Sequence, residues 1–141
     1  MEDMLEDQPL GYLLTRVGNA LRAEVTETVL EPLGIAFPQY ICMRFLAKYP
    51  GRSNADLARD TNVTPQAMNM VLRRLESRGL VTRPASVASG RSLPAKLTRE
   101  GEELLKRTDA GVRAAERKLM AGLTAEQRQE FKRVLVALGS D

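Results

Sequence analysis

Histidine and tryptophan are absent from this sequence of 141 residues, and cysteine occurs once, as Cys42. Zinc sites are built from several His and Cys ligands, and Ser-His-Asp and Cys-His nucleophile systems need an imidazole. An intrachain disulfide needs a second cysteine. The sequence therefore excludes these sites, and we expect no enzyme, no metal and no cofactor.

Long apolar stretches are missing as well. No run approaches the roughly 20 residues of a membrane-spanning helix, and the acidic start, MEDMLEDQ, lacks the basic and apolar segments of a signal peptide. We therefore expect a cytoplasmic protein. Hydrophobic residues make up 43% of the chain and aromatic residues only 4%, which predicts one globular domain with a core of Leu, Val, Ala and Met.

Positive charge is concentrated in one part of the chain. Residues 51–98 hold eight basic and three acidic side chains, a net charge of +5, whereas the other 13 basic and 15 acidic side chains sum to −2. A basic segment of this kind is typical of a surface that meets a polyanion. The eight basic residues are Arg52, Arg59, Arg73, Arg74, Arg78, Arg83, Arg91 and Lys96.

Two helices are predicted ahead of this segment. Residues 9–30 place apolar side chains three and four positions apart, which indicates an amphipathic helix that Pro32 and Gly34 end. A second helix has Pro38 in its first turn, where a missing N–H costs nothing, and ends before Pro50. The N-terminal part of the chain is therefore expected to be helical.

The basic segment opens with two short helices joined by a tight turn. Ser53 is a good N-cap for a helix over residues 54–61, and Asn62 tolerates the left-handed backbone that a tight turn requires. Thr64 caps a longer helix over residues 65–78, whose first residue is proline. This pattern is typical of a helix-turn-helix, and an ordinary αα-hairpin is the alternative. The local positive charge favours the DNA-binding interpretation.

A β-hairpin is predicted directly after the second helix. Helical periodicity is lost after Val81, and residues 80–82 and 94–97 are predicted as short strands that flank a turn rich in serine and glycine. A hairpin in this place makes the unit a winged helix, with the wing at about residues 80–98. The small-residue stretch is therefore interpreted as part of this unit and not as a linker between domains.

Two more helices complete the chain. Thr98 is the expected N-cap of a long helix over residues 99–123, and Thr124 with Gln127 forms a capping box for a final helix over residues 125–139. A winged-helix core of fewer than roughly 70 residues cannot bury the apolar stripes of the first helix and of both final helices.

The outer helices leave two arrangements open, a dimer joined through them or a monomer that wraps them around its own core. Symmetric dimers dominate soluble oligomers, and a two-fold dimer would place two recognition helices about one DNA turn, roughly 34 Å, apart. The predicted fold is mainly α. Residues 35–98 are expected to form a winged helix-turn-helix DNA-binding domain, and residues 1–34 and 99–141 the dimerisation helices.

The order of these elements resembles the MarR family of bacterial transcriptional regulators. The resemblance covers nearly the whole chain, through LGYLLTRVGNALR, LGIAFPQYICMRFLA, LARDTNVTPQAMNMVLRRLESRGLV and KLTREGEELL, and its most specific parts are RLESRGLV and LTREG. It implies an obligate homodimer on a pseudo-palindromic operator. It also implies a repressor that small aromatic or phenolic ligands, often anionic, release.

Helix geometry selects the residues that would contact DNA. The core takes one face of the helix over residues 65–78, and the family reads bases with the opposite face near its start. Glutamine and asparagine amides can each bind adenine in a bidentate manner, and apolar side chains can touch a thymine methyl group. The candidates for bases are Pro65, Gln66, Ala67, Asn69 and Met70, and those for phosphates are Ser53, Thr64, Arg73 and Arg74.

The resemblance also assigns a role to the wing. MarR wings commonly carry Asp-x-Arg, whose arginine enters the minor groove, and the matching triplet here is Ser89-Gly90-Arg91. Arginine in a narrow minor groove reads shape and negative potential rather than a base code. We therefore expect Arg91 to add affinity and a preference for A·T pairs, with a serine in place of the aspartate that orients it.

Family ligands often lie between the dimer helices and the winged helix, where Tyr12, Arg16, Tyr40 and Arg44 are candidates to bind a carboxylate. Cys42 lies in mid-helix and is interpreted as a buried, inert thiol rather than a redox sensor. The alternative function is a winged-helix module that binds protein and has no operator of its own. Salt-dependent binding of duplex DNA separates the two functions.

Overall fold

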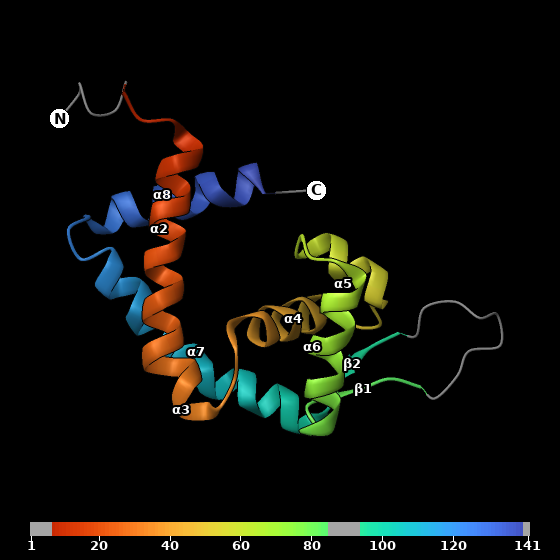
Figure 1. The fold of residues 1–141 in the computed structure, drawn as a ribbon. Helices are drawn as coiled ribbons and strands as arrows, with labels where there is room; N and C mark the ends of the chain where they lie inside the picture. Colours follow the sequence, from red (N-terminus) through yellow and green to blue (C-terminus); the bar gives the residue numbers. More distant parts are fainter. Residues whose placement is uncertain (1–6, 85–93, 140–141) are drawn as a thin grey trace.

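The computed structural model describes residues 7–84 and 94–139. Helices dominate this part of the chain, and a small antiparallel sheet lies beside the helix-turn-helix (Figure 1). The terminal helices lie on one side of the molecule and the helix-turn-helix with its hairpin on the other (Figure 1). In chain order the elements are α2 (Leu10–Val25), η1 (Thr26–Leu30), α3 (Glu31–Leu33), α4 (Phe37–Lys48), α5 (Asn54–Asp60), α6 (Pro65–Ser77), β1 (Val81–Thr82), β2 (Lys96–Leu97), α7 (Arg99–Leu119) and α8 (Ala125–Leu138).

The first helix is longer than predicted. α2 passes through η1, a single π-helical turn, into α3, so the helix continues beyond residue 30 to Leu33. Gly34 ends it with a left-handed φ of 69°. The π turn explains why Pro32 does not stop the helix earlier. It interrupts the α-helical hydrogen-bond ladder just before Pro32, which then lies in the first turn of α3, where no N–H is required.

The helix-turn-helix and its caps are as predicted. Ser53 and Thr64 cap α5 and α6 with their side-chain oxygens, and Asn62 has a left-handed φ of 56° in the turn between them. α6 buries Met68, Leu72 and Leu75 against α4 and α5. These caps satisfy N–H groups that the first turn of a helix leaves without partners, and so they fix where each helix begins.

The predicted hairpin is present at its base. β1 pairs antiparallel with β2, with Val81 opposite Leu97 and Thr82 opposite Lys96. Pro94 forms a further bridge to Ser53, which attaches the hairpin to the start of α5. Ser89, Gly90 and Arg91 lie outside the described residues, and their roles in the wing stay predictions.

α7 runs from the hairpin back to the N-terminal helix. Thr98 caps it as predicted, and its buried face contacts both α2 and α4. α7 ends at Leu119 and not at residue 123 as expected. The last four residues instead form a turn in which the Leu123 N–H donates to the Met120 carbonyl at 3.0 Å, and the Thr124 capping box then begins α8.

Apolar side chains remain exposed on the terminal helices. α8 buries no residue, and the first half of α2 is largely exposed. None of the helices within residues 7–84 and 94–139 is long and apolar enough to cross a membrane. We call the following set the terminal apolar surface: Leu10, Leu14 and Val17 of α2, with Val134, Leu135 and Leu138 of α8.

Candidate nucleic-acid interface

The start of α6 is held in place by polar contacts. The Thr64 hydroxyl accepts the N–H of Ala67 at 3.1 Å, and the Asn54 amide nitrogen donates to the Pro65 carbonyl at 3.1 Å, which ties the starts of α5 and α6 together. The Ser53 hydroxyl makes the equivalent cap on α5 at 3.1 Å. Each capping hydroxyl uses an acceptor lone pair, so its proton remains available to donate to a phosphate oxygen.

The predicted base-contacting residues lie together on the outer face of α6. Pro65, Gln66 and Ala67 are exposed, and the Met70 side chain is exposed as well. Asn69 is only half-buried, because it faces the hairpin side of the helix. The structure therefore presents these residues on the surface of one rigid helix, with two amides and one thioether near its N-terminal end.

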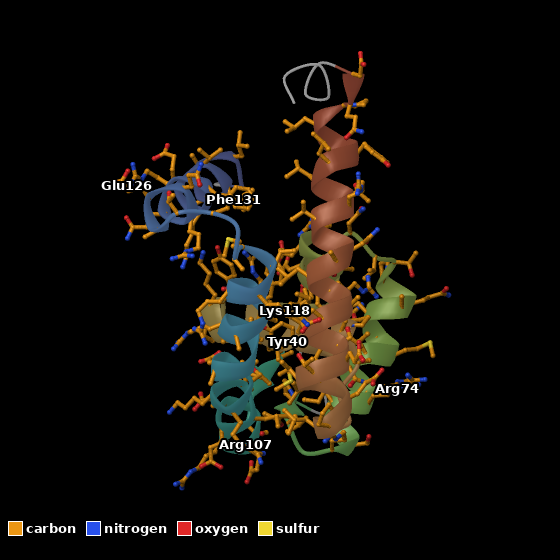
Figure 2. All side chains as sticks on the ribbon, turned by 90° about the vertical axis from the view of Figure 1, so that its left-hand side faces the viewer. Tyr40, Arg74, Arg107, Lys118, Glu126 and Phe131 are labelled. Carbon is orange, nitrogen blue, oxygen red and sulfur yellow. The ribbon has the colours of Figure 1, made fainter. Side chains whose placement is uncertain are left out.

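Cations continue this face toward the end of α6. Arg73 and Arg74 are exposed and form no ion pair within the described part of the chain. Figure 2 shows Arg74 on the outer side of α6, away from Arg107 on α7. Guanidinium groups in this position can neutralise phosphates on either side of a groove that α6 enters.

Three other arginines of the basic segment are engaged by its three acids. Asp60 pairs with Arg52 at 3.6 Å and Glu76 with Arg83 at 2.6 Å, and Asp56 pairs with Arg59. Hydrogen bonds from Ser53, followed by the contact with Arg59, hold the pKa of Asp56 below its usual value. The positive charge available for a polyanion is therefore more localised on α6 than the sequence count indicates.

Arg83 has a role that the sequence did not reveal. It follows β1, its side chain is only 11% exposed, and its guanidinium donates to Glu76 Oε1 from Nε at 2.8 Å. Nη1 of the same group donates to Asn69 Oδ1 at 3.2 Å. In the sequence, Arg83 is only one of eight basic residues that could meet a polyanion, because nothing in its spacing shows that the hairpin brings it against α6.

Arg78 connects the end of α6 to the end of the N-terminal helix. Its guanidinium donates to the Gly34 carbonyl at 2.6 Å and to the Leu33 carbonyl at 3.1 Å. These carbonyls belong to a helix C-terminus, where acceptors lack intrahelical partners and a cation is favoured. Arg78 therefore fixes the end of α6 relative to the helix that begins at Leu10.

The four predicted ligand-binding residues form two separate pairs. Arg44 Nε donates to the hydroxyl of buried Tyr40 at 3.1 Å, and its Nη2 pairs with Asp109 of α7 at 2.8 Å. Tyr12 and Arg16 contact each other on the exposed half of α2, with the guanidinium carbon 5.8 Å from the ring centre. The sequence did not indicate Asp109, which already neutralises Arg44.

An open pocket of about 860 Å³ lies beside Arg44. Three of the cations around it, Arg44, Arg52 and Arg59, are paired with acids, and Lys48 has no ion pair within the described residues. Tyr49 supplies an aromatic surface on which Lys48 and Arg52 lie. Such a pocket suits an anionic aromatic molecule better than a neutral one. Its lining residues are Arg44, Phe45, Ala47, Lys48, Tyr49, Arg52, Arg59, Asp60 and Gly139.

Cys42 is completely buried, as the sequence predicted. Burial raises the pKa of its thiol to about 12, against the opposing effect of the nearby Arg83 charge. The thiolate is the reactive form, so this thiol is held in its inert state. No group of three or more potential metal-ligating side chains occurs within the described ranges.

We expect Cys42 to resist alkylation in the folded protein. Iodoacetamide at pH 8 should modify it only as fast as the protein unfolds, while urea-unfolded protein should react promptly. Because the pKa of the Cys42 thiol is higher in the folded than in the unfolded protein, the protonated thiol stabilises the folded state. This contribution to the free energy of unfolding is fully present below the unfolded pKa of 9.0 and is lost as pH rises toward 12. Mass spectrometry of timed samples measures the modification, and rapid labelling of the native protein would contradict the burial argument.

A capped helix-turn-helix, followed by a hairpin that packs against its second helix, defines a winged helix-turn-helix protein. Residues 33–92 match the profile of the MarR family. The HTH-type transcriptional repressor Rv2887 of Mycobacterium tuberculosis strain H37Rv is 58% identical over 138 residues, which cover 98% of this chain and 99% of that protein. The chain belongs to the MarR family.

Solved structures of Rv2887 agree with this assignment. Its complex with DNA has a TM-score of 0.80 and 53% identity, and the match covers 94% of this chain and 99% of that one. Its complex with salicylic acid has a TM-score of 0.79 and 58% identity, covering 96% and 99% respectively. The mainly helical winged-helix fold predicted from the sequence is thereby confirmed.

Proposed function

We propose that this chain is a homodimeric transcriptional repressor that binds a pseudo-palindromic operator through α6 and is released by a small aromatic acid. The observation that carries the proposal is the polar outer face of α6, held rigid by caps at Ser53 and Thr64. The similarity to a named repressor, and to its complex with DNA, supports the same function.

Specific recognition would come from the first turns of α6. The Gln66 side chain is exposed and forms no hydrogen bond with the described residues, so its amide oxygen and its NH2 group are both available for a bidentate contact with adenine. Met70, 58% exposed, is placed to touch a thymine methyl group, with Pro65 and Ala67 beside the same groove. Ser53, Thr64, Arg73 and Arg74 would hold phosphates and thereby set the register.

The terminal apolar surface supports the dimer. Leu138 is 70% and Leu10 66% exposed, and α8 buries nothing against its own chain. In Figure 2, α8 lies to one side of α2, beyond the end of α7. Pairing this surface with its copy about a two-fold axis would remove it from water and present two α6 helices to one face of a duplex. Arg78, which binds the end of the N-terminal helix, would fix the position of α6 relative to the dimer interface.

Release by a ligand follows if the ligand prefers a conformer whose α6 spacing does not fit DNA. Salicylic acid is bound in a solved structure of Rv2887. In this chain, Arg44 and the Tyr40 hydroxyl, beside this pocket, are the proposed carboxylate partners, and the ligand would take the place of Asp109 on Arg44. Tyr12 and Arg16 stay predictions for the same ligand, and Arg91 for the minor groove.

Duplex titration at two salt concentrations tests the function. A repressor that neutralises several phosphates should lose about 10³-fold or more in affinity for its operator between 50 and 200 mM salt. Duplexes selected from a random pool supply the operator. A protein-binding module is the alternative function, and weak binding of every duplex with no salt dependence would favour it.

Gln66→Ala is expected to weaken operator binding by about 1–3 kcal/mol and to relax the preference at one position of each half-site. The reason is the loss of a base contact without any change in phosphate contacts. Fluorescence anisotropy on operator and random duplexes measures both effects. Gln129→Ala, on the exposed side of α8, is the control and should bind like wild type. An equal loss on random DNA would refute base reading by Gln66.

A further inference from the structure

The contact between Arg83 and Asn69 determines which group Asn69 can offer to DNA. A guanidinium has only hydrogen-bond donors, so the amide atom that faces Arg83 must be the oxygen, and the 3.2 Å contact joins Nη1 to Oδ1. The amide NH2 group is therefore turned away from Arg83. No ambiguity between oxygen and nitrogen remains for this side chain, unlike for an exposed asparagine.

Arg83 itself has little freedom to move. Its side chain is 11% exposed, and Nε and Nη2 both donate to one oxygen of Glu76, at 2.8 and 2.6 Å. Glu76 and Asn69 lie seven residues apart on α6, so one guanidinium from the hairpin spans two helical turns. Charge-assisted bonds of this kind are stronger than neutral ones, and they hold the amide in one orientation.

We infer that Arg83 is a specificity-determining positioning residue, which makes Asn69 a donor toward the DNA base edge. This inference rests on the proposed function, in which α6 enters the major groove. A bidentate contact with adenine needs the amide oxygen and nitrogen side by side on one base, and here the oxygen is turned toward Arg83, on the hairpin side of α6. Asn69 therefore does not read adenine in the way that its residue type alone suggests.

Guanine is the base that this orientation selects. Its major-groove edge presents two neighbouring acceptors, N7 and O6, to an NH2 group. Adenine presents a single acceptor, N7, beside an amino donor, cytosine presents an amino donor, and thymine presents a single acceptor, O4, so none of the three offers the Asn69 amino group two neighbouring acceptors. Gln66, whose amide oxygen and NH2 group are both free, keeps the preference for adenine. Two amides one turn apart on α6 thus read different bases because only one of them contacts Arg83.

Selection of duplexes from a random pool, followed by sequencing, tests this inference. Asn69→Ala identifies the operator position that Asn69 reads, because the preference there disappears. At that position, wild type should prefer guanine over adenine by about tenfold. In Arg83→Met the amide is free to turn, and the preference should fall to about twofold or move to adenine. Other operator positions should keep their bases.

Two further variants separate orientation from charge and stability. Arg83→Lys keeps the charge and can still pair with Glu76, but one ammonium cannot hold both Glu76 and Asn69, so it should shift the preference as Arg83→Met does. Arg99→Met removes an arginine that is paired with Glu103 on α7 and should change no base preference. Arg83→Lys also serves as the test if Arg83→Met fails to fold.

The results test the role of Arg83 separately from the proposed function of the protein. If wild type enriches no duplex at all, the proposed function is overturned. If wild type enriches an operator but Arg83→Lys and any folded Arg83→Met select the same base at every position, the inference alone is overturned. An unchanged set of preferences in Asn69→Ala would also overturn it, since Asn69 would then read no base.

Discussion

Leu135→Glu is expected to dissociate the proposed homodimer and to weaken operator binding at least 100-fold, which corresponds to about 3 kcal/mol. Leu135 is 41% exposed on α8, in the terminal apolar surface that the proposed dimer buries. Two-fold symmetry places the new carboxylate in the interface twice, and an unpaired charge is costly to remove from water. Each monomer would then hold only one half-site.

The matched control is Gln129→Glu. It adds the same carboxylate to α8, six residues before Leu135, a spacing that turns it about 120° around the helix from that residue. Glutamate is a good helix former, so neither variant should unfold α8. Sedimentation velocity over a range of protein concentrations measures the association, and circular dichroism confirms that the helices remain. A Leu135→Glu protein that sediments as a dimer at the same concentrations as wild type would show that α8 lies outside the interface.

Gly101→Ala is expected to lower the free energy of unfolding by about 3 kcal/mol. Gly101 is buried in the first turn of α7, where α7 packs directly on the backbone that leads into β1. A Cβ at this position would overlap the Leu80 carbonyl oxygen and lie 3.2 Å from Leu97 Cδ2. A backbone carbonyl cannot move aside as a side chain can, so either α7 or the hairpin must shift.

Helix propensity by itself predicts the opposite sign, because alanine favours a helix over glycine by about 1 kcal/mol. Ala114→Gly, at an exposed position of α7, measures that contribution and should cost about 1 kcal/mol. Urea unfolding at fixed protein concentration compares the two variants, because the proposed dimer would make apparent stability depend on concentration. A Gly101→Ala protein as stable as wild type would disprove the close approach of α7 to Leu80.

The parts of the fold that the sequence predicted depend on contacts within a few residues. The hydroxyl oxygens of Ser53 and Thr64 each accept a hydrogen bond from the backbone N–H of the third residue after them. Asn62 has a left-handed backbone, which an asparagine side chain tolerates. Such features need no knowledge of the rest of the chain. The two helix ends that were misplaced, at residues 30 and 123, depend instead on a π turn and on the start of the next helix.

The candidate site divides in the same way. The outer face of α6 follows from helix periodicity, so the exposed positions of Gln66 and Met70 could be predicted from the sequence, while their contacts with DNA stay predictions. The partners of Arg44 illustrate the limit, because Tyr40 lies four residues away and Asp109 lies 65 residues away. Only the first of these contacts has a spacing that helix geometry predicts.

By itself, the sequence determined the elements, their caps and the face that α6 turns outward, since local hydrogen bonds and apolar periodicity decide these. Tertiary structure decided which cations remain free and which way an amide points. Arg78 reaches carbonyls 44 and 45 residues away, and Arg83 reaches Asn69 only because the hairpin folds back onto α6. A side chain's charge is fixed by its residue type, but its partner is fixed by which elements pack together.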